Sequence, residues 1–347
     1  MKTTLNIIIA TALVAVATTV SAKSWRINNN AAAAPNFTSI NAAMSSADVT
    51  AGDTLYLDPG TSLSENQTVS KQVTIVGPGY FRGDTPHAFA YIQGCLYINA
   101  ASTKVEGVIM LSDIRIKAPN VTIERCKFTM IEVGDDRANA QNCTIRQCYG
   151  ERIEGQGASY NGYNYHLCSS YCTVENCILI SSAGWGCIYD LYTPTIRHNY
   201  LKETENSAVL YSLDNAIIQA NIMLNTKTST NLLSNVNNIS NISQNVMSCA
   251  ETTYSSVPTD VNKFGNTSEA GIFTLTGMND LRYQLKDDSP AKGYASDGGD
   301  CGPYGGLTPY VAGGLPNGYP YYTKAIIPAK SKDGKVNVSL KIKTQNE

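Results

Sequence analysis

Six segments of the chain share one pattern of apolar and polar positions. Each has a central apolar residue with mostly polar neighbours, and an apolar or small residue five positions later. The central residues are Ile123, Ile145, Val174, Ile196, Ile218 and Ile242, at steps of 22, 29, 22, 22 and 24 residues. A regular period with one longer step is typical of stacked repeats with a loop inserted into one of them. No unit is long enough to bury its own apolar face, so neighbouring units must stack.

The polar columns of this alignment predict strands in register. Residues on either side of an inward apolar residue point to the opposite face of a strand, so two columns are predicted to face solvent. They are Thr122, Thr144, Thr173 and Thr195 in one, and Glu124, Arg146, Glu175 and Arg197 in the other. Parallel strands lie about 4.8 Å apart, so unlike charges become neighbours and contribute roughly 0.2–1 kcal/mol per contact to the register.

A further column predicts a bend after each strand. It contains Cys126, Cys148, Cys177, Asn199, Asn221 and Asn245, and two places later Phe128, Gly150, Leu179, Leu201, Met223 and Met247 return to the inward face. Stacked Asn side chains bond to one another and to the backbone of tight turns, and Cys is a small apolar substitute. The pattern is strand, bend, strand, and predicts an all-β parallel solenoid.

The columns resemble those of the right-handed parallel β-helix, or pectin-lyase-like, superfamily, especially its secreted bacterial members. Four further regions are similar to parts of that fold: Phe37–Met44 to its capping helix, Ala51–Gly60 and Lys71–Gly79 to its first rungs, and Tyr283–Ala291 with Asp297–Gly302 to its exit segment. The resemblance implies a β-helix over residues 23–306 with an N-terminal capping helix. It implies no activity, because the superfamily holds lyases, hydrolases, esterases and members without known catalysis.

The two ends of the chain carry different signals. Residues 1–22 combine a basic start, an apolar run from Leu5 to Val20 and small residues before Lys23, which predicts a secretory signal peptide cleaved near Ala22. The protein is therefore expected outside the cytoplasm: extracellular, periplasmic or at the cell surface. No later apolar stretch approaches the ~20 residues of a spanning helix. Residues 307–347 end in an alternating strand pattern and are predicted to pack on the β-helix or cap it.

Charge and cysteine content narrow the partners. A net charge of -2 without a basic block disfavours nucleic acid and anionic membranes. Ten Cys in an exported chain suggest disulfides. Stacking predicts buried thiols for Cys126, Cys148, Cys177, Cys143 and Cys172, and leaves Cys168, Cys187, Cys249 and Cys301 as the better disulfide candidates. With three His and no suitable spacing, a zinc centre is disfavoured.

The long step places an inserted loop between Gly150 and Cys172. The loop holds the candidate substrate-binding residues Tyr160, Tyr163 and Tyr165 and the candidate catalytic residue His166. Aromatic rings beside polar groups suit a saccharide. The alternative is a solvated, Gly-rich excursion without a ligand.

One repeat earlier, the run from Glu132 to Arg137 brings three carboxylates and a cation together, and Asp135, Asp136 and Arg137 are its candidate catalytic residues. The repeat offset stacks Asp135 over Gly157 and Gly186, which predicts a common face with further binding residues. These are Trp185, Tyr189, Asp190 and Tyr192. The carboxylates suit Ca²⁺, the one cofactor that the residues suggest, or acid–base cleavage of a glycoside, and Arg137 suits a uronate. The alternative is an ion-paired bend.

The motifs of pectin-degrading hydrolases are not reproduced. Arg115-Ile-Lys117 precedes Asp135-Asp136 instead of following it, Gly155-Gln-Gly157 lacks the required His, and Asn-Thr-Asp is missing. Arg115 and Lys117 are interpreted as outward strand residues. The sequence predicts an exported protein that binds a complex polysaccharide, and leaves open whether that polysaccharide contains uronate and whether a lyase or hydrolase reaction cleaves it. The alternative is a non-catalytic surface or adhesion module, and the oligomeric state is not specified.

Overall fold

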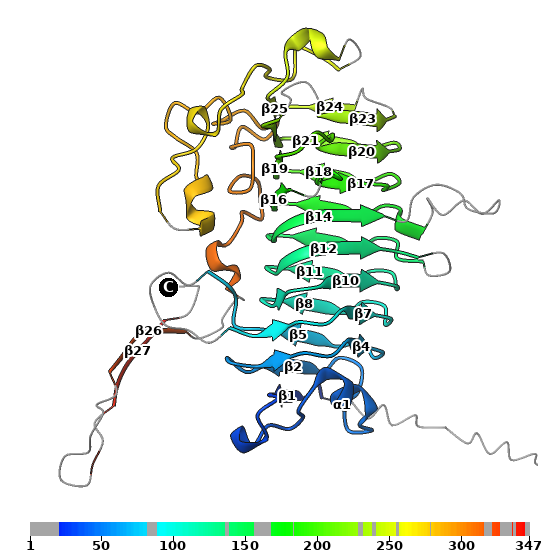
Figure 1. Cartoon of the computed structure of the whole chain (residues 1–347), viewed down its shortest axis with the longest axis vertical. Helices are drawn as coiled ribbons and strands as arrows, with labels where there is room; N and C mark the ends of the chain where they lie inside the picture. Colours follow the sequence, from blue (N-terminus) through cyan, green and yellow to red (C-terminus); the bar gives the residue numbers. More distant parts are fainter. Residues whose placement is uncertain are drawn as a thin grey trace, which may run out of the picture.

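The predicted parallel β-helix is confirmed by a computed structural model, in which strands stack in two long parallel sheets along one axis (Figure 1). The structure describes residues 21–81, 89–135, 139–155, 168–182, 184–227, 232–237, 241–254, 257–277, 279–315, 321–326, 335 and 338–343.

The first sheet holds one strand from each coil. Its order is β1 (Ser24–Ile27), β2 (Thr54–Leu57), β5 (Thr74–Val76), β8 (Lys104–Glu106), β11 (Thr122–Glu124), β13 (Thr144–Arg146), β15 (Thr173–Glu175), β18 (Thr195–Arg197), β21 (Ile217–Gln219) and β24 (Ile242–Ser243).

The second sheet consists of two rows of strands that the long strands β12 (Lys127–Val133) and β14 (Tyr149–Gly155) join. One row adds β3 (Ser62–Leu63), β6 (Tyr91–Ile92), β9 (Ile109–Met110), β16 (Ile178–Ser181), β19 (Tyr200–Glu203), β22 (Ile222–Asn225) and β25 (Val246–Met247). The other adds β4 (Gln67–Val69), β7 (Leu96–Ile98), β10 (Asp113–Ile116), β17 (Ile188–Tyr189), β20 (Leu210–Leu213) and β23 (Leu233–Val236).

The remaining elements are short. They are α1 (Ile40–Ser45), the 3-10 helices η1 (Ala31–Ala33), η4 (Glu251–Thr253), η5 (Glu269–Gly271), η6 (Asn279–Tyr283) and η7 (Ala312–Gly314), and the antiparallel pair β26 (Tyr321–Ile326) and β27 (Ser339–Lys343). α1 begins after Ser39, whose hydroxyl accepts a bond from the N–H of Ala42, and buries Ile40 and Met44 against the first coil. This is the predicted capping helix, three residues shorter at its start.

Strand register confirms the aligned columns. Ile123 pairs with Ile145 and Ile145 with Val174, and all three are fully buried inside the solenoid. The Thr column and the Glu/Arg column stack on the outside as predicted. Solvent exposure was wrong for two members, because only 3% of Glu124 and 6% of Glu175 are exposed. Both are ion-paired, and the C-terminal segment covers this side.

The bend column forms the predicted ladder. Asn199 donates to the side-chain oxygen of Asn221 at 2.9 Å, and Asn221 donates to that of Asn245 at 3.1 Å. Asn262, which the alignment missed, extends the ladder by one coil through Asn245. The residue before each of the six aligned column positions has a positive φ, from 52° to 55° at Arg125, Gln147, Asn176, His198, Ala220 and Gln244. One left-handed residue per coil therefore makes the bend.

A C-terminal strap, residues 301–315, lies along this row of bends. Gly302 N–H donates to the carbonyl of Ala220 at 2.8 Å, and Asn176 donates to the carbonyls of Pro303 and Gly305 at 2.9 and 2.7 Å. Gln147 donates to the carbonyl of Pro309 at 2.7 Å. The strap thus runs back along the solenoid, from the coil of Ala220 towards earlier coils.

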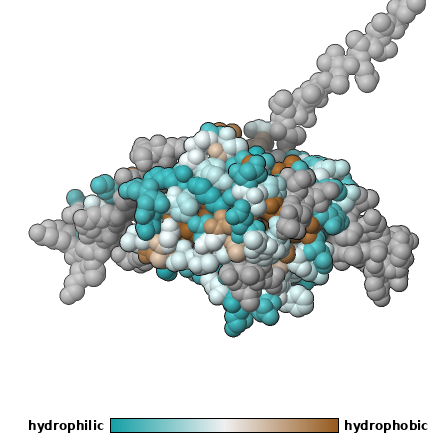
Figure 2. Space-filling model, turned by 90° about the horizontal axis from the view of Figure 1, so that it is seen from above, coloured by the Kyte–Doolittle hydropathy of each residue, from teal (hydrophilic) through white to brown (hydrophobic). Residues whose placement is uncertain are grey.

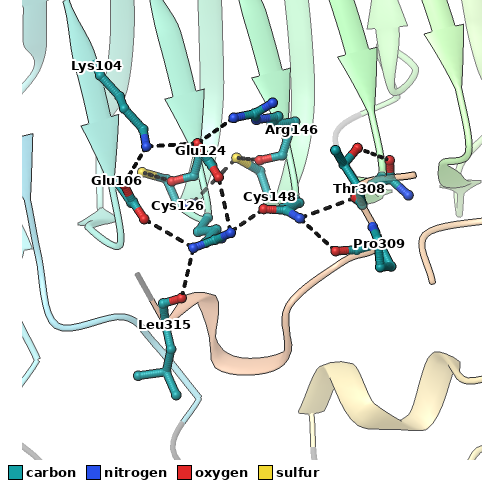
Figure 3. Close-up of polar contacts among 12 residues, drawn as sticks. Lys104, Glu106, Glu124, Cys126, Arg146, Cys148, Thr308, Pro309 and Leu315 are labelled. Atoms are coloured by element: carbon teal, nitrogen blue, oxygen red, sulfur yellow. Dashed lines mark hydrogen bonds and ion pairs between the residues drawn. The ribbon is translucent and has the colours of Figure 1, made fainter. Parts of the chain in front are cut away.

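Beneath the strap lies a group of paired charges, the strap cluster, formed by Lys104, Glu106, Glu124, Arg125 and Arg146 (Figure 3). Lys104 Nζ lies 2.6 Å from Glu106 and 3.0 Å from Glu124. Arg125 contacts both glutamates at 3.2 and 3.3 Å and donates to the carbonyl of Leu315 at 3.3 Å. These charges hold coils and strap together.

The far end of the solenoid is also covered. Lys263 bridges to Val246, so residues 261–263 begin one more coil beyond β24 and β25. Viewed from this end, the described surface mixes hydrophilic and hydrophobic side chains and shows no single apolar patch (Figure 2). No described helix has the length and apolar character needed to cross a membrane.

The cysteines of the stacked columns are buried as predicted: Cys126, Cys143, Cys148, Cys172 and Cys177. No disulfide joins any of the ten cysteines, all of which lie in described residues. The suggestion that Cys168, Cys187, Cys249 and Cys301 form disulfides is therefore wrong in this structure. Cys187 and Cys249 are packed in the core, and Cys301, the first residue of the strap, is buried in the second apolar cluster, so apolar neighbours make each a small hydrophobe.

Candidate functional site

An outward column on the second sheet gathers acidic, basic and tyrosine side chains. Strand register stacks Thr68, Tyr97, Arg115, Glu132, Glu154, Tyr189, Tyr211 and Ser234, which we call the acid–tyrosine column. Its members alternate with buried residues such as Ile131 and Ile153, so the pleat points them outward. Neighbouring members of the column lie on strands that are about 4.8 Å apart.

Glu132 stands between carboxylates and cations at the centre of the column. Arg115 Nε lies 3.6 Å from its Oε2, beyond hydrogen-bond distance, while Arg115 Nη2 lies 3.4 Å from Asp113. Burial raises the pKa of Glu132, with Asp113 and Asp135 adding to the effect, and the positive charges of Arg115 and Lys117 only partly oppose it. The pKa therefore lies above its ordinary value.

Glu154, the next member, has fewer cations around it. Its pKa is raised chiefly by burial and also by the charges of Glu132, Asp113 and Asp190, while Arg152 lowers it. Arg152 Nε lies 3.8 Å from Glu154 Oε2, again a loose pair. Tyr189 donates its hydroxyl to the same oxygen and fixes the carboxyl group in place.

Three cations flank this carboxyl pair. Arg115 and Lys117 lie over the ring of Tyr97, at 5.9 and 5.7 Å from its centre. Lys117 also pairs with Asp135 at 2.5 Å, and Arg152 follows on β14. Arg115 and Arg152 both have an Nε atom without a hydrogen-bond acceptor, so neither guanidinium is saturated by the protein. Such groups suit an anionic ligand.

The described candidate residues fall on or beside this column. Tyr189 is a member, and Asp190 follows it at a left-handed bend with φ 57°. Asp135 lies just past β12, paired with Lys117. Trp185 is 64% exposed on the excursion between β16 and β17, and Tyr192 bridges to the neighbouring coils at Ser170 and Asp214.

Six candidates lie outside the described residues. They are Asp136, Arg137, Tyr160, Tyr163, Tyr165 and His166. Their proposed roles stay predictions.

The predicted stacking of Asp135 over Gly186 was wrong. Glu154 pairs with Tyr189, because the coil of Val174 has extra residues between β16 and β17, whereas β12 and β14 run without a break. The constant offset from the repeat centre therefore fails after β16. The constant offset places residue 183 beside Glu154, whereas Tyr189, six residues later, pairs there.

Sequence reasoning grouped Glu132 with Asp135 and Asp136 but missed its pairing with Glu154, and it discounted two cations of this pair. Arg115 and Lys117 do point outward from a strand, as interpreted, but they lie at the site. Glu132 and Glu154 each lie nine residues after the centre of their repeat, Ile123 and Ile145. That shared offset could have found the pair.

A metal site does not form among the described residues, where no three His, Cys, Asp or Glu side chains gather as ligands. Asp297 and Asp300 accept bonds from the N–H groups of Gly299 and Gly293 at 2.9 and 2.8 Å. They stabilise turns. The suggested Ca²⁺ site involves Asp136, which lies outside the described residues.

Comparison with known proteins does not add an activity. No protein-family model matches the chain, and no curated protein matches its sequence.

Proposed function

We propose that the protein binds and hydrolyses an acidic polysaccharide along the acid–tyrosine column. The observation that carries the proposal is the pair Glu132 and Glu154, in register on neighbouring strands, with both pKa values raised. Glycoside hydrolysis needs two carboxyl groups in different protonation states. The spacing of about 4.8 Å between strands is close to the roughly 5–5.5 Å that separates the carboxyl groups of retaining glycosidases.

The surroundings assign the two roles. Glu154 has one opposing cation and three acidic neighbours, so it is the group that keeps a proton and donates it to the leaving glycosidic oxygen. Glu132 has Arg115 and Lys117 beside it and is the ionised partner that attacks the anomeric carbon. Tyr189 positions the acid.

The substrate class follows from the cations and rings. Arg115, Lys117 and Arg152 can pair with uronate carboxylates, and tyrosine rings on neighbouring strands offer stacking surfaces for successive sugars. The signal-like N-terminus and the resemblance to pectin-lyase-like proteins support a role outside the cytoplasm. Ca²⁺ could bind between the carboxylates of a uronate and Asp135, because both supply oxygen ligands.

The test is turnover of uronate and neutral glycans, with and without Ca²⁺. The wild-type protein should release new reducing ends from a uronate polymer without the ultraviolet absorbance of unsaturated products. Glu154→Gln and Glu132→Gln should each lower kcat about 10²–10⁴-fold, the usual contribution of an acid or base, and retain substrate binding. Glu175→Gln, on the first sheet, is the control and should keep wild-type kcat.

Three outcomes would contradict the proposal. A rise in ultraviolet absorbance means β-elimination, so the hydrolytic roles would be wrong. Unchanged kcat in Glu154→Gln would show that the acid–tyrosine column does not take part in the hydrolysis. Retention of glycans without cleavage by the wild type would favour the alternative of a non-catalytic surface or adhesion module.

A further inference from the structure

A hollow of about 300 Å³ opens on the outer face of the second sheet, away from the acid–tyrosine column. It is lined by Tyr80, Phe81, Phe89, Tyr91, Ile109, Leu111, Lys127 and Asn279. Four lining residues are aromatic and two are aliphatic. Leu111 forms an exposed part of the wall, with 55% of its surface accessible.

The hollow is the open part of a longer apolar strip. Strand register stacks Tyr91, Ile109, Lys127, Tyr149, Ile178, Tyr200, Ile222 and Val246 in one outward column. In the later coils the C-terminal segment covers this column and makes a second core outside the solenoid. In the coils of Tyr91, Ile109 and Lys127 the same kind of surface borders the hollow.

The covered part shows what such a surface accepts. Phe273 packs its ring on Tyr200, with 4.6 Å between ring centres. From the same short segment, Glu269 accepts the hydroxyl of Tyr200 and pairs with Lys202 at 3.0 Å. An aromatic ring and a carboxylate, four residues apart in the chain, thus occupy this strip together.

The open part holds a cation, Lys127, as the covered part holds Lys202, but no described acidic side chain pairs with it. Lys127 Nζ lies 4.8 Å from the centre of the Phe81 ring and makes no ion pair within the described part of the chain. No acidic side chain lines the hollow among the described residues. An ammonium beside aromatic walls favours a ligand with a flat apolar body and one negative charge.

We propose that this hollow binds an aromatic carboxylate, with the ring against Phe81, Phe89 and Tyr91 and the carboxylate on Lys127. The site is separate from the carboxyl pair. Lys127 and Glu132 lie on the same strand, five residues apart, which is about 17 Å at ~3.3 Å per residue. The proposal therefore stands or falls independently of the proposed hydrolysis.

Calorimetric titration of the full chain with trans-cinnamate, cinnamamide and galacturonate tests it. The wild type should bind cinnamate more tightly than cinnamamide, which has the same shape without the charge. Lys127→Met should weaken cinnamate binding about tenfold or more, the factor that a hydrogen bond to a charged group supplies, and leave cinnamamide binding unchanged. Lys292→Met is the matched control, since this exposed lysine pairs with Asp287 elsewhere.

If circular dichroism shows that Lys127→Met is misfolded, a second variant tests the same site. Leu111→Glu, at the exposed rim, should weaken cinnamate more than cinnamamide through charge repulsion. Equal binding of cinnamate and cinnamamide by the wild type, equal cinnamate binding by folded Lys127→Met, or tighter binding of galacturonate would overturn the proposal. Glu154→Gln should bind cinnamate like the wild type whether or not the protein cleaves glycans.

Discussion

The strap cluster and the acid–tyrosine column have similar charged groups on two faces of one solenoid, but they are arranged differently. In the strap cluster, Glu124 meets Lys104 at 3.0 Å and Arg125 at 3.3 Å. In the column, Glu132 and Glu154 meet their arginines only at 3.6 and 3.8 Å.

The pKa directions differ accordingly. Burial would raise the pKa of Glu124, but the charges and hydrogen bonds of Lys104 and Arg146 outweigh it, so the pKa lies below its ordinary value. Burial of Glu132 and Glu154 is only partly offset by nearby cations, and their pKa values are raised. Close ion pairing under the strap stabilises the fold. In the column, the carboxyl groups of Glu132 and Glu154 have raised pKa values, so their ionisation costs stability, and such groups suit acid–base catalysis.

The largest expected effect is the loss of unfolding free energy when one arginine of each cluster is replaced. Arg125→Met removes the partner of two buried glutamates and should cost roughly 3–5 kcal/mol of unfolding free energy. Arg152→Met, in the column, removes one loose pair and should cost less than about 1 kcal/mol. Urea unfolding measures both. Equal losses would mean that the two clusters do not differ in kind.

The next effect depends on pH. Glu124→Gln should lower the unfolding free energy by about 3 kcal/mol at neutral pH. Because the folded pKa of Glu124 lies below its unfolded value, its contribution is present above about pH 4.3 and is lost as pH falls through the folded pKa. Thermal unfolding at several pH values should show wild type and variant converging in acid. A constant difference would contradict the ionic role.

A smaller effect concerns the strap itself. Asn176→Ala removes two bonds to strap carbonyls and should cost about 1–3 kcal/mol. It should also speed hydrogen exchange at the N–H of Gly302. Gln219→Ala, which loses one bond to Ser243, is the control and should stay within about 0.5 kcal/mol of wild type. Unchanged exchange in Asn176→Ala would show that the strap is held elsewhere.

The repeat pattern predicted the coils because inward positions are strongly selected for apolar residues. Ile123, Ile145 and Val174 stack as the alignment required, and Asn199 begins the expected ladder. Packing of residues 307–347 on the β-helix was predicted, but the course of the strap along the bends was not, since its contacts use backbone carbonyls and left-handed bend residues, which leave no apolar period. For the same reason the burial of Glu124 was missed.

The site was predicted in part. Tyr189 and Asp135 were predicted on one face and lie on or beside the acid–tyrosine column, but the constant offset broke down where an excursion separates β16 from β17. Glu132 and Glu154 share an offset that the sequence displays, yet a carboxylate on an outward strand position has no signal that separates a functional pair from a solvated one. Their raised pKa values depend on burial, which only the folded arrangement determines.

The most direct test is the unfolding free energy of Glu154→Gln at neutral pH, measured beside Glu124→Gln. A carboxyl group with a folded pKa above its unfolded value favours folding less as pH rises between the two values, so it costs stability at neutral pH. The account predicts that Glu154→Gln is more stable than wild type, by no more than about 1 kcal/mol, while Glu124→Gln is less stable. A loss of stability in Glu154→Gln, of the same sign as in Glu124→Gln, would contradict the account.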